Sequence, residues 1–419
     1  MRLLFLTYDF YPNFSANSSI INNLSQAFIY LGHEVDVLPL KPCKDLKEEE
    51  IWNNIKIYRI NHTFDKSQVK EYLSHHDFHS ALHLVFALFK DRSNHKEYLK
   101  RHWSYYPLKR FQEILTQRGY HIVVNVCYPF ESCLTIMEYL EKQDKSFGWI
   151  MYMQDPFASN YYYRSKYAKN ELDEIQTKAF MMADKIIVTT PILKEIVNQP
   201  LVIPIQKLKA LNFPIIKKPR RADIENSIIF QKNYVNCVFV GKFNRDTRNP
   251  DKLFHIFEQF HENRIRLHII GEDKENWNAY LHQGFDNIFF YGTQSKEIAI
   301  NAELDANILV NVGNLVSNQL PSKLLEYIST GKPIVNLYKT LDCPTLEYME
   351  RYPYSINIAE DSITPKIMQK LLYFCVHYRK INVNYRYIYK KFYDCTIDYI
   401  TYEFLTICDE ILNNNQQLT

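Results

Sequence analysis

The sequence predicts an α/β protein with two doubly wound parallel sheets, and three observations support this fold class. Short apolar runs alternate with amphipathic segments along most of the 419 residues, a pattern typical of parallel strands covered by helices on both faces. The alternation stops in the proline-rich residues 200–233 and then starts again. The length also suits two or three domains of roughly 100 to 200 residues.

The first series of elements predicts an N-terminal Rossmann-like domain over residues 1–205. It opens with an apolar run at residues 3–8, a helical pattern over 18–31 and an alternating strand over 34–38. The later expected strands are 122–127, 149–153 and 185–190, and the later expected helices are 131–141 and 161–182.

The second series predicts another Rossmann-like domain over residues 206–384. Its expected strands are 236–240, 266–270, 288–291, 306–310 and 333–337, and its expected helices are 250–261 and 321–330. Residues 385–419 are expected to form a C-terminal helix that packs back on the first domain. Ligands of such sheets bind beyond the carboxyl ends of the strands, so we expect a cleft between two facing domains.

Composition excludes several classes of protein. Lys and Arg number 50 and Asp and Glu number 47, a net charge of +3, which leaves no broad electrostatic footprint for nucleic acid. The eight cysteines form no C-x-x-C pair, so they are expected to be reduced thiols. The apolar start is too short for a signal peptide, and no apolar stretch approaches the roughly 20 residues that span a bilayer. We therefore expect a cytoplasmic protein without a nucleic-acid partner.

The helix expected over 321–330 is the most informative segment. Ser322 and Lys323 lie in its first turn, where backbone N–H groups and the positive end of the helix dipole favour a phosphate. Glu326 projects from the same side about one turn further on, so a diphosphate at the helix tip would place a ribose near its carboxylate. On the helix alone, an ordinary amphipathic helix with a solvated Glu326 is an equal alternative.

A cationic loop follows the strand at 236–240. It begins at Gly241 and contains Lys242, Arg245 and Arg248. Lys supplies a point charge and Arg a planar fork for phosphate oxygens. A solvated charge run would explain this loop in isolation, but its occurrence beside the phosphate-type helix favours an anion site.

Together these residues resemble the donor-binding half of GT-B fold glycosyltransferases of the group-1, retaining type. The matching segments occur in the family's order and lie at residues 3–8, 11–12, 32–37, 183–189, 240–248, 269–271, 321–327 and 331–333. The resemblance implies that a sugar moves from a nucleotide diphosphate sugar to a glycan or lipid-linked acceptor, with retention of configuration. Surface polysaccharide biosynthesis is the setting that it implies.

The candidate site residues fall into three groups. We expect Lys242, Arg245, Lys323 and Asp155 to be catalytic, and Gly241, Arg248, Gln319, Ser322, Glu326 and Gly271 to bind the donor. Asn17, Ser18, Ser19 and Gln154 are expected on the acceptor side. Asp155 follows a strand end, where orienting an acceptor hydroxyl and capping the next helix are equal alternatives.

Two positions depart from the family pattern. Asn318 stands where the family has the first glutamate of a pair, and residues 15–19 replace a glycine pair after the first strand.

Because the sequence has no D-x-D carboxylate pair, we expect no metal and no cofactor, with the donor phosphates neutralised by protein cations. A nucleotide-sugar epimerase and a non-catalytic scaffold on the same fold remain the alternatives.

A helical segment near residues 76–90 carries His79 and His83, four positions apart. That spacing suits a metal site, but the opposite face is a complete apolar stripe, which favours an ordinary amphipathic helix. Cations and aromatic residues continue to Arg110, so peripheral membrane contact is a further expectation, with a solvated domain face as the more common alternative.

Overall fold

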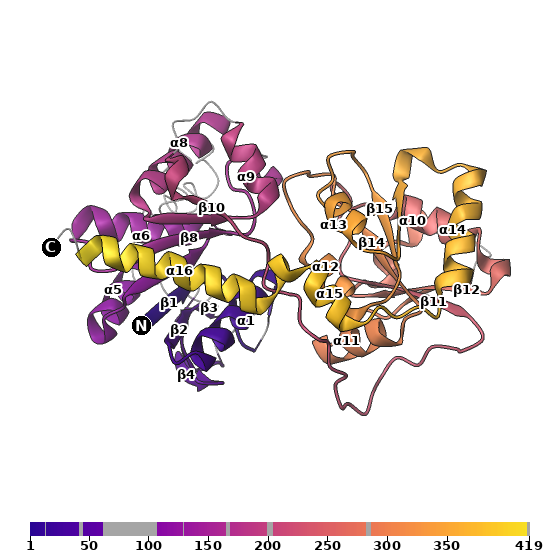
Figure 1. The fold of residues 1–419 in the computed structure, drawn as a ribbon, viewed down its shortest axis with the longest axis horizontal. Coiled ribbons are helices and arrows are strands. Elements are labelled where there is room, and N and C mark those ends of the chain that lie inside the picture. Colours follow the sequence, from indigo (N-terminus) through magenta and orange to yellow (C-terminus); the bar gives the residue numbers. More distant parts are fainter. Residues whose placement is uncertain are drawn as a thin grey trace, which may run out of the picture. The chain divides into compact units, whose positions relative to one another are not determined.

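The computed structural model describes residues 1–12, 14–41, 45–61, 107–128, 130–164, 168–198, 204–281 and 286–416. The chain divides into two compact units, Met1–Pro214 with Asp398–Thr419 and Ile215–Ile397. Each unit contains one large open sheet with helices packed against it (Figure 1). The helix expected around His79 and His83, and most of the basic patch near it, lie outside the described residues.

The sheet of the first unit has the strand order β10-β9-β8-β7-β1-β2-β5-β4. Its strands are β1 (Arg2–Leu6), β2 (Glu34–Leu38), β4 (Glu49–Trp52), β5 (Ile55–Tyr58), β7 (Ile122–Val126), β8 (Gly148–Met153), β9 (Lys185–Val188) and β10 (Leu208–Ala210). All neighbours are parallel except the β4–β5 hairpin. From β5 to β9 the order is that of a Rossmann sheet, in which the crevice between β1 and β7 is the topological switch point.

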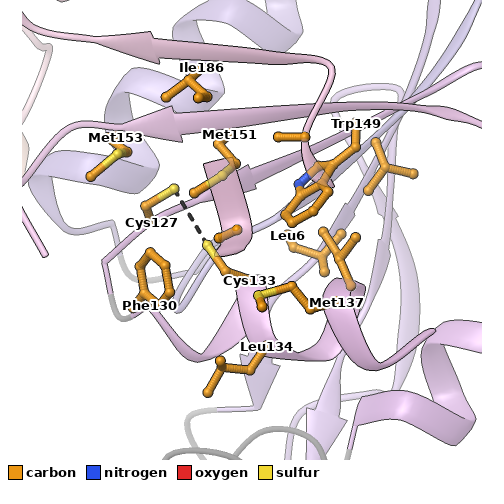
Figure 2. Packing of buried hydrophobic residues seen from close by; sticks show 14 of the residues in the cluster. Leu6, Cys127, Phe130, Cys133, Leu134, Met137, Trp149, Met151, Met153 and Ile186 are labelled. Carbon is orange, nitrogen blue, oxygen red and sulfur yellow. Dashed lines mark hydrogen bonds between the residues drawn. The ribbon is translucent and has the colours of Figure 1, made fainter. Parts of the chain in front are cut away.

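Helices cover both faces of this sheet. They are α1 (Ala16–Tyr30), α5 (Pro107–Arg118), α6 (Glu131–Lys142), α7 (Tyr161–Arg164), α8 (Lys169–Met182), α9 (Thr190–Val197) and α16 (Ile397–Gln416). Figure 2 shows one part of the buried core, where Trp149, Met151 and Met153 of β8 meet Cys133 and Met137 of α6. The opposite face of β8 meets the C-terminal helix: Phe404 of α16 packs on Tyr152 with ring centroids 5.9 Å apart.

The second unit repeats the Rossmann order, with its sheet arranged β13-β12-β11-β14-β15-β16 and parallel throughout. The strands are β11 (Val235–Val240), β12 (Ile265–Ile270), β13 (Ile288–Phe290), β14 (Ile308–Val312), β15 (Ile334–Tyr338) and β16 (Ser355–Ala359). The helices are α10 (Asp251–Glu258), α11 (Lys296–Asp305), α12 (Ser322–Thr330), α13 (Thr345–Arg351), α14 (Pro365–Tyr378) and α15 (Tyr385–Lys391). The predicted fold class, two parallel α/β domains, is confirmed.

The domain boundaries differ from the expected ones. The first unit runs on to Pro214 because β10 pairs with β9 and so extends the first sheet. Of the C-terminal segment, only α16 belongs to the first unit. α15 stays with the second unit, where Arg351 bonds to Asp394 and to the backbone of Lys391.

Several element boundaries also differ. α1 begins at Ala16 rather than at residue 18, because Ser15 is its N-cap and accepts a hydrogen bond from the Ser18 N–H at 3.3 Å. The helix expected over 161–182 is two helices, α7 and α8. The strand expected to end at residue 190 ends at Val188, since Thr190 already begins α9. None of the described helices is both long and apolar enough to cross a membrane.

Candidate functional site

The loops that follow β11 and β14 meet at the switch point of the second sheet. The Arg248 Nε donates a hydrogen bond to Asn314 Oδ1 at 2.8 Å, and Asn314 Nδ2 donates to Gln319 Oε1 at 3.2 Å. The backbone N–H of Leu315 donates to the Thr247 carbonyl at 2.8 Å. These bonds fix the cationic loop to the segment that leads into α12, at the edge where ligands of such sheets bind.

The tip of the cationic loop is a tight turn. Asn244 and Arg248 exchange backbone hydrogen bonds at 3.1 and 2.9 Å, and the Asn244 side chain accepts from the N–H groups of Asp246 and Thr247, both at 2.9 Å. The turn leaves the Arg245 side chain exposed, although its guanidinium touches the Asn276 carbonyl at 3.4 Å.

Lys242 and Arg248 are in contrasting environments. Lys242 is exposed and forms no ion pair with any residue in the described ranges. Arg248 is half-buried, and burial lowers the pKa of its guanidinium from its usual value. An arginine keeps its charge under such a shift, because its ordinary pKa is so high. Arg248 therefore carries a fixed, half-buried positive charge, and Lys242 carries an exposed one at the start of the same loop.

The glycines after β11 and β12 allow the two loops to touch. A Cβ at Gly271, where φ is +113°, would lie 2.5 Å from the Gly241 carbonyl oxygen. Glu272 then accepts hydrogen bonds from the Phe243 N–H at 2.6 Å and from the Trp277 indole at 3.0 Å. Loop packing by itself therefore requires glycine at position 271, whatever contact it makes with a donor.

Lys323, in the first turn of α12, is held between two carboxylates. Its Nζ lies 2.8 Å from Glu303 Oε1 and 2.6 Å from Glu326 Oε2. Glu303 belongs to α11 and is only 3% exposed, whereas Lys323 and Glu326 are about one third exposed at 28% and 30%. The ammonium group therefore bridges the buried carboxylate of Glu303 and the more exposed carboxylate of Glu326.

The electrostatics of this trio favour a charged Lys323 and a charged Glu326. Burial opposes both charges, but attraction to Glu303 and Glu326 raises the pKa of Lys323, and attraction to Lys323 lowers the pKa of Glu326. Lys296 and Lys217 also lie close enough to lower the pKa of Glu326. Burial raises the pKa of Glu303.

Tyr327 connects α12 to the end of β11. Its hydroxyl group bonds to the backbone of Val240, immediately before Gly241. Both Arg248 and Lys323 lie within electrostatic range of this buried hydroxyl. The structure thus brings Arg248, Gln319, Lys323 and Glu326 to one edge of the second sheet.

The first unit brings some of its candidates together at the carboxyl end of β8. The Asn17 side chain, in the first turn of α1, donates a hydrogen bond to Asp155 Oδ2 at 3.2 Å. Gln154 is buried, and neither of its amide atoms has a hydrogen-bond partner in the described structure. Asp155 does not cap the next helix, because α7 begins only at Tyr161.

The serines near the start of α1 have separate places. Ser18 is buried and bonds to Ser15, which caps the helix and donates to Asp9 at 2.8 Å. Ser19 is half-buried, and its N–H donates to the Ser15 carbonyl. Of the acceptor-side candidates, Asn17 and Gln154 therefore lie nearest to Asp155.

Sequence reasoning missed four residues that build the candidate donor site at the carboxyl edge of the second sheet. They are Glu272, Glu303, Asn314 and Tyr327. Glu303 had a weak local signal, because Ser295 is a typical N-cap for the helix that carries it. Its contact with Lys323 joins two helices, so no spacing within one element reveals it. Among the described residues, no group of three or more His, Cys, Asp and Glu side chains is arranged to hold a metal ion.

Solved structures of GT-B glycosyltransferases share this fold. The sucrose-phosphate synthase from Thermosynechococcus elongatus has a TM-score of 0.64 and 12% identity, covering 100% of this chain and 98% of that chain. The lipopolysaccharide outer core galactosyltransferase WaaB gives 0.57 and 15%, covering 98% and 99%. The catalytic domain of starch synthase IV from Arabidopsis thaliana, bound to ADP and acarbose, gives 0.60 and 9%, again covering 98% and 99%. The chain therefore has the GT-B fold, as the resemblance predicted.

Sequence comparison adds no closer assignment. No protein-family model and no curated protein sequence matches the chain. Because the identities to these solved structures are 9 to 15%, the similarity is one of fold.

Proposed function

We propose that the protein is a glycosyltransferase that moves a sugar from a nucleotide diphosphate sugar to a glycan or lipid-linked acceptor. The observation that carries the proposal is the convergence of Arg248, Lys323 and Glu326 around Tyr327 at the switch point of the second sheet. The GT-B fold supports the same function, and the starch synthase with this fold is bound to ADP.

In this proposal the diphosphate lies against the cationic loop. Arg248 supplies a fixed, half-buried charge. The exposed side chains of Lys242 and Arg245 can reorient so that their charged groups contact the phosphate oxygens. As the bond between the sugar and the phosphate breaks, negative charge grows on the leaving diphosphate. Cations held in place before the reaction stabilise that state more than the ground state, which is how they accelerate the step.

Glu326 accepts hydrogen bonds from the ribose hydroxyls, and the structure suggests a revised role for Lys323. Because its ammonium is already paired with two carboxylates, we propose that Lys323 chiefly holds the Glu326 carboxylate charged and oriented. Ser322 and Gln319, at the start of α12 and just before it, would contact the donor beside Glu326. Gly241 and Gly271 would let the loops after β11 and β12 pack closely against the donor.

The acceptor is proposed to bind at the carboxyl edge of the first sheet. Asp155, oriented by Asn17, would accept a hydrogen bond from the acceptor hydroxyl that forms the new glycosidic bond. The unsatisfied amide of Gln154 and the serines of α1 would contact the rest of the acceptor. Retention of configuration, a reaction without metal and a role in surface polysaccharide assembly at the inner face of a membrane complete the proposal.

A nucleotide panel tests this function first. Thermal unfolding should be measured with UDP, GDP, ADP and their sugars, because a ligand at a hundredfold excess over its dissociation constant stabilises by about 2.7 kcal/mol. With the stabilising nucleotide, Glu326→Gln should weaken binding by roughly 1.5 to 3 kcal/mol. The exposed Glu350 of α13 provides the matched control, since Glu350→Gln should leave the affinity unchanged.

Product analysis then separates the three candidate activities. A glycosyltransferase releases the nucleoside diphosphate only in step with sugar transfer to an acceptor. Conversion of the donor sugar without any acceptor would instead identify an epimerase. A protein that binds none of the nucleotides would be a scaffold, and the proposal would then be wrong.

A further inference from the structure

The outer face of α14 is basic and aromatic. Lys366, Lys370, Tyr373 and His377 are exposed and follow one another at intervals of four and three residues, which places them on one side of the helix. Lys380 is exposed in the turn that directly follows the helix. The opposite side, with Leu371, Phe374 and Cys375, is buried in the core of the second unit. The face is therefore held rigidly on the surface of a folded domain.

The charge of this region has a single sign. No Asp or Glu occurs between Ser362 and Tyr393, although acidic and basic residues are nearly equal in number along the whole chain. The cations of the same stretch are Lys366, Lys370, Arg379, Lys380, Arg386, Lys390 and Lys391. None of them forms a side-chain ion pair within the part of the chain that the structure describes. An ordinary solvated helix face usually mixes both signs, as the pairs on α5 and α6 do.

An aromatic pair lies between the lysines. The rings of Tyr373 and His377 stack with centroids 3.7 Å apart, and His377 Nδ1 donates to the Tyr373 carbonyl at 2.9 Å. Tyr373 is 57% exposed, and the neighbouring Val376 is 37% exposed. Exposed tyrosine and valine side chains bordered by lysines suit an interface between water and lipid, where tyrosine and lysine side chains turn their apolar parts toward the lipid and keep their polar ends in water.

We propose that the outer face of α14 docks on an anionic phospholipid surface. Positive charge along one helix face complements negative headgroups, and a helix that lies flat presents all its cations to them at once. The exposed tyrosine favours a lipid surface over nucleic acid. The proposal does not rest on enzymatic activity, and it places membrane contact in the second unit rather than near His79 and His83.

Vesicle sedimentation tests the proposal on the full chain. The wild type should pellet with phosphatidylglycerol vesicles and remain in solution with pure phosphatidylcholine, and the bound fraction should fall as salt rises. Each cation near such a surface contributes about fivefold to partitioning. The triple variant Lys366→Glu, Lys370→Glu and Lys380→Glu should therefore bind anionic vesicles on the order of a hundredfold more weakly.

A matched triple variant distinguishes a specific face from net charge. Lys169→Glu, Lys232→Glu and Lys252→Glu reverse the same number of exposed cations elsewhere on the molecule, and this control should bind like the wild type. Equal weakening in both variants would overturn the proposal, as would failure of the wild type to bind anionic vesicles. Binding of the α14 face to a polyglutamate peptide but not to vesicles would assign it to an acidic protein instead.

Two further measurements complete the test. Thermal melting of both triple variants checks that they are folded, and Tyr373→Ala, which keeps every charge, should lower vesicle binding most at high salt. Nucleotide binding should be the same in all variants, because α14 contributes no residue to the proposed donor site. Loss of vesicle binding with intact nucleotide binding separates this inference from the proposed function.

Discussion

The hydroxyl of Tyr327 substitutes for a neighbouring strand at the end of β11. It accepts a hydrogen bond from the Val240 N–H at 2.7 Å and donates one to the Val240 carbonyl at 3.3 Å. β14 pairs with β11 only at Cys237 and Val238, so without the phenol the last residue of the strand would lack a partner on that side. Because Tyr327 follows Glu326, these bonds fix the position of α12 relative to the cationic loop.

Tyr327→Phe should lower both stability and nucleotide affinity. Removing the hydroxyl leaves a partly buried N–H and C=O unsatisfied, at a cost of about 1 to 3 kcal/mol measured by urea unfolding. Tyr352→Phe is the matched control: its hydroxyl donates to the Lys332 carbonyl at 2.7 Å, beyond the opposite end of α12. Both variants should lose stability, but calorimetry should show weaker nucleotide binding only for Tyr327→Phe. Equal affinities would mean that α12 does not position the donor.

Gly271→Ala should destabilise the second unit more than a comparable substitution in the first. A left-handed backbone costs roughly 1 to 2 kcal/mol for a residue with a Cβ, and at position 271 that atom also collides with the Gly241 carbonyl oxygen. Gly32 has a φ of +85° with nothing within 4 Å of its Cβ position, so Gly32→Ala isolates the backbone cost. We expect the collision to add about 1 to 3 kcal/mol in denaturant unfolding. Equal losses would show that the loops can separate without penalty.

Local signals in the sequence predicted the sheets and part of the site. Lys323 and Glu326 lie three residues apart in one helix, so their shared face follows from helical geometry alone. The ion pair with Glu303 depends on how α11 packs on α12, and it is the reason that we propose for Lys323 the role of holding a carboxylate rather than a phosphate.

Other features carried local signals that the sequence reasoning did not use. The β4–β5 hairpin turns at Asn53 and Asn54, with φ of +49° and +65°, and asparagine is one of the residues that tolerate the positive φ of such turns. α14 likewise begins with Thr364 as its N-cap, followed by Pro365 at the first helical position. The bonds from Arg248 through Asn314 to Gln319 had no local signal, because they join two loops far apart in the chain.

Glu303→Gln tests the revised role of Lys323. The variant keeps the shape of the side chain but removes the buried negative charge, so the ammonium is held by Glu326 alone and the carboxylate loses its fixed position. We expect donor KM to rise several-fold with little change in kcat, since Glu303 is only 3% exposed and in this proposal acts on the donor only through Lys323 and Glu326. Glu258→Gln is the control, because Glu258 is equally buried but lies on α10. This variant should leave the donor KM unchanged. A fall in kcat at constant KM would contradict a positioning role.

Acid should destabilise the second unit through His268. Burial, aided by the nearby Arg266, lowers the pKa of His268 to about 3, and the ring bonds to Tyr291 at 2.8 Å and Asn236 at 3.0 Å. At pH values between the unfolded pKa near 6.5 and the folded pKa, the His268 imidazole is protonated in the unfolded chain but neutral in the folded protein. Stability contributed by the neutral ring is therefore present above about pH 6.5 and is lost as pH falls, by up to about 1.4 kcal/mol per pH unit.

His268→Gln should flatten this dependence. Urea unfolding at a series of pH values from 7 downward measures the slope for both proteins, and other groups contribute equally to each. A wild-type slope that the substitution leaves unchanged would show that His268 can be protonated in the folded state.

The last prediction concerns the exposed end of the cationic loop and separates charge stabilisation by side chains from stabilisation by a metal. Arg245→Ala should lower the single-turnover transfer rate more than it weakens donor binding, because the charge that Arg245 meets grows as the sugar leaves. By analogy with a lost oxyanion donor, the loss is on the order of 100-fold. Lys252→Ala, which removes an exposed cation from α10, should leave the rate unaltered.

Turnover of the wild type should also continue in EDTA, since the proposal assigns stabilisation of the leaving diphosphate to Lys242, Arg245 and Arg248. If EDTA abolishes transfer and added Mg²⁺ restores it, a bound metal carries that charge instead. If Arg245→Ala retains the full rate in either condition, the leaving diphosphate does not reach the tip of this loop.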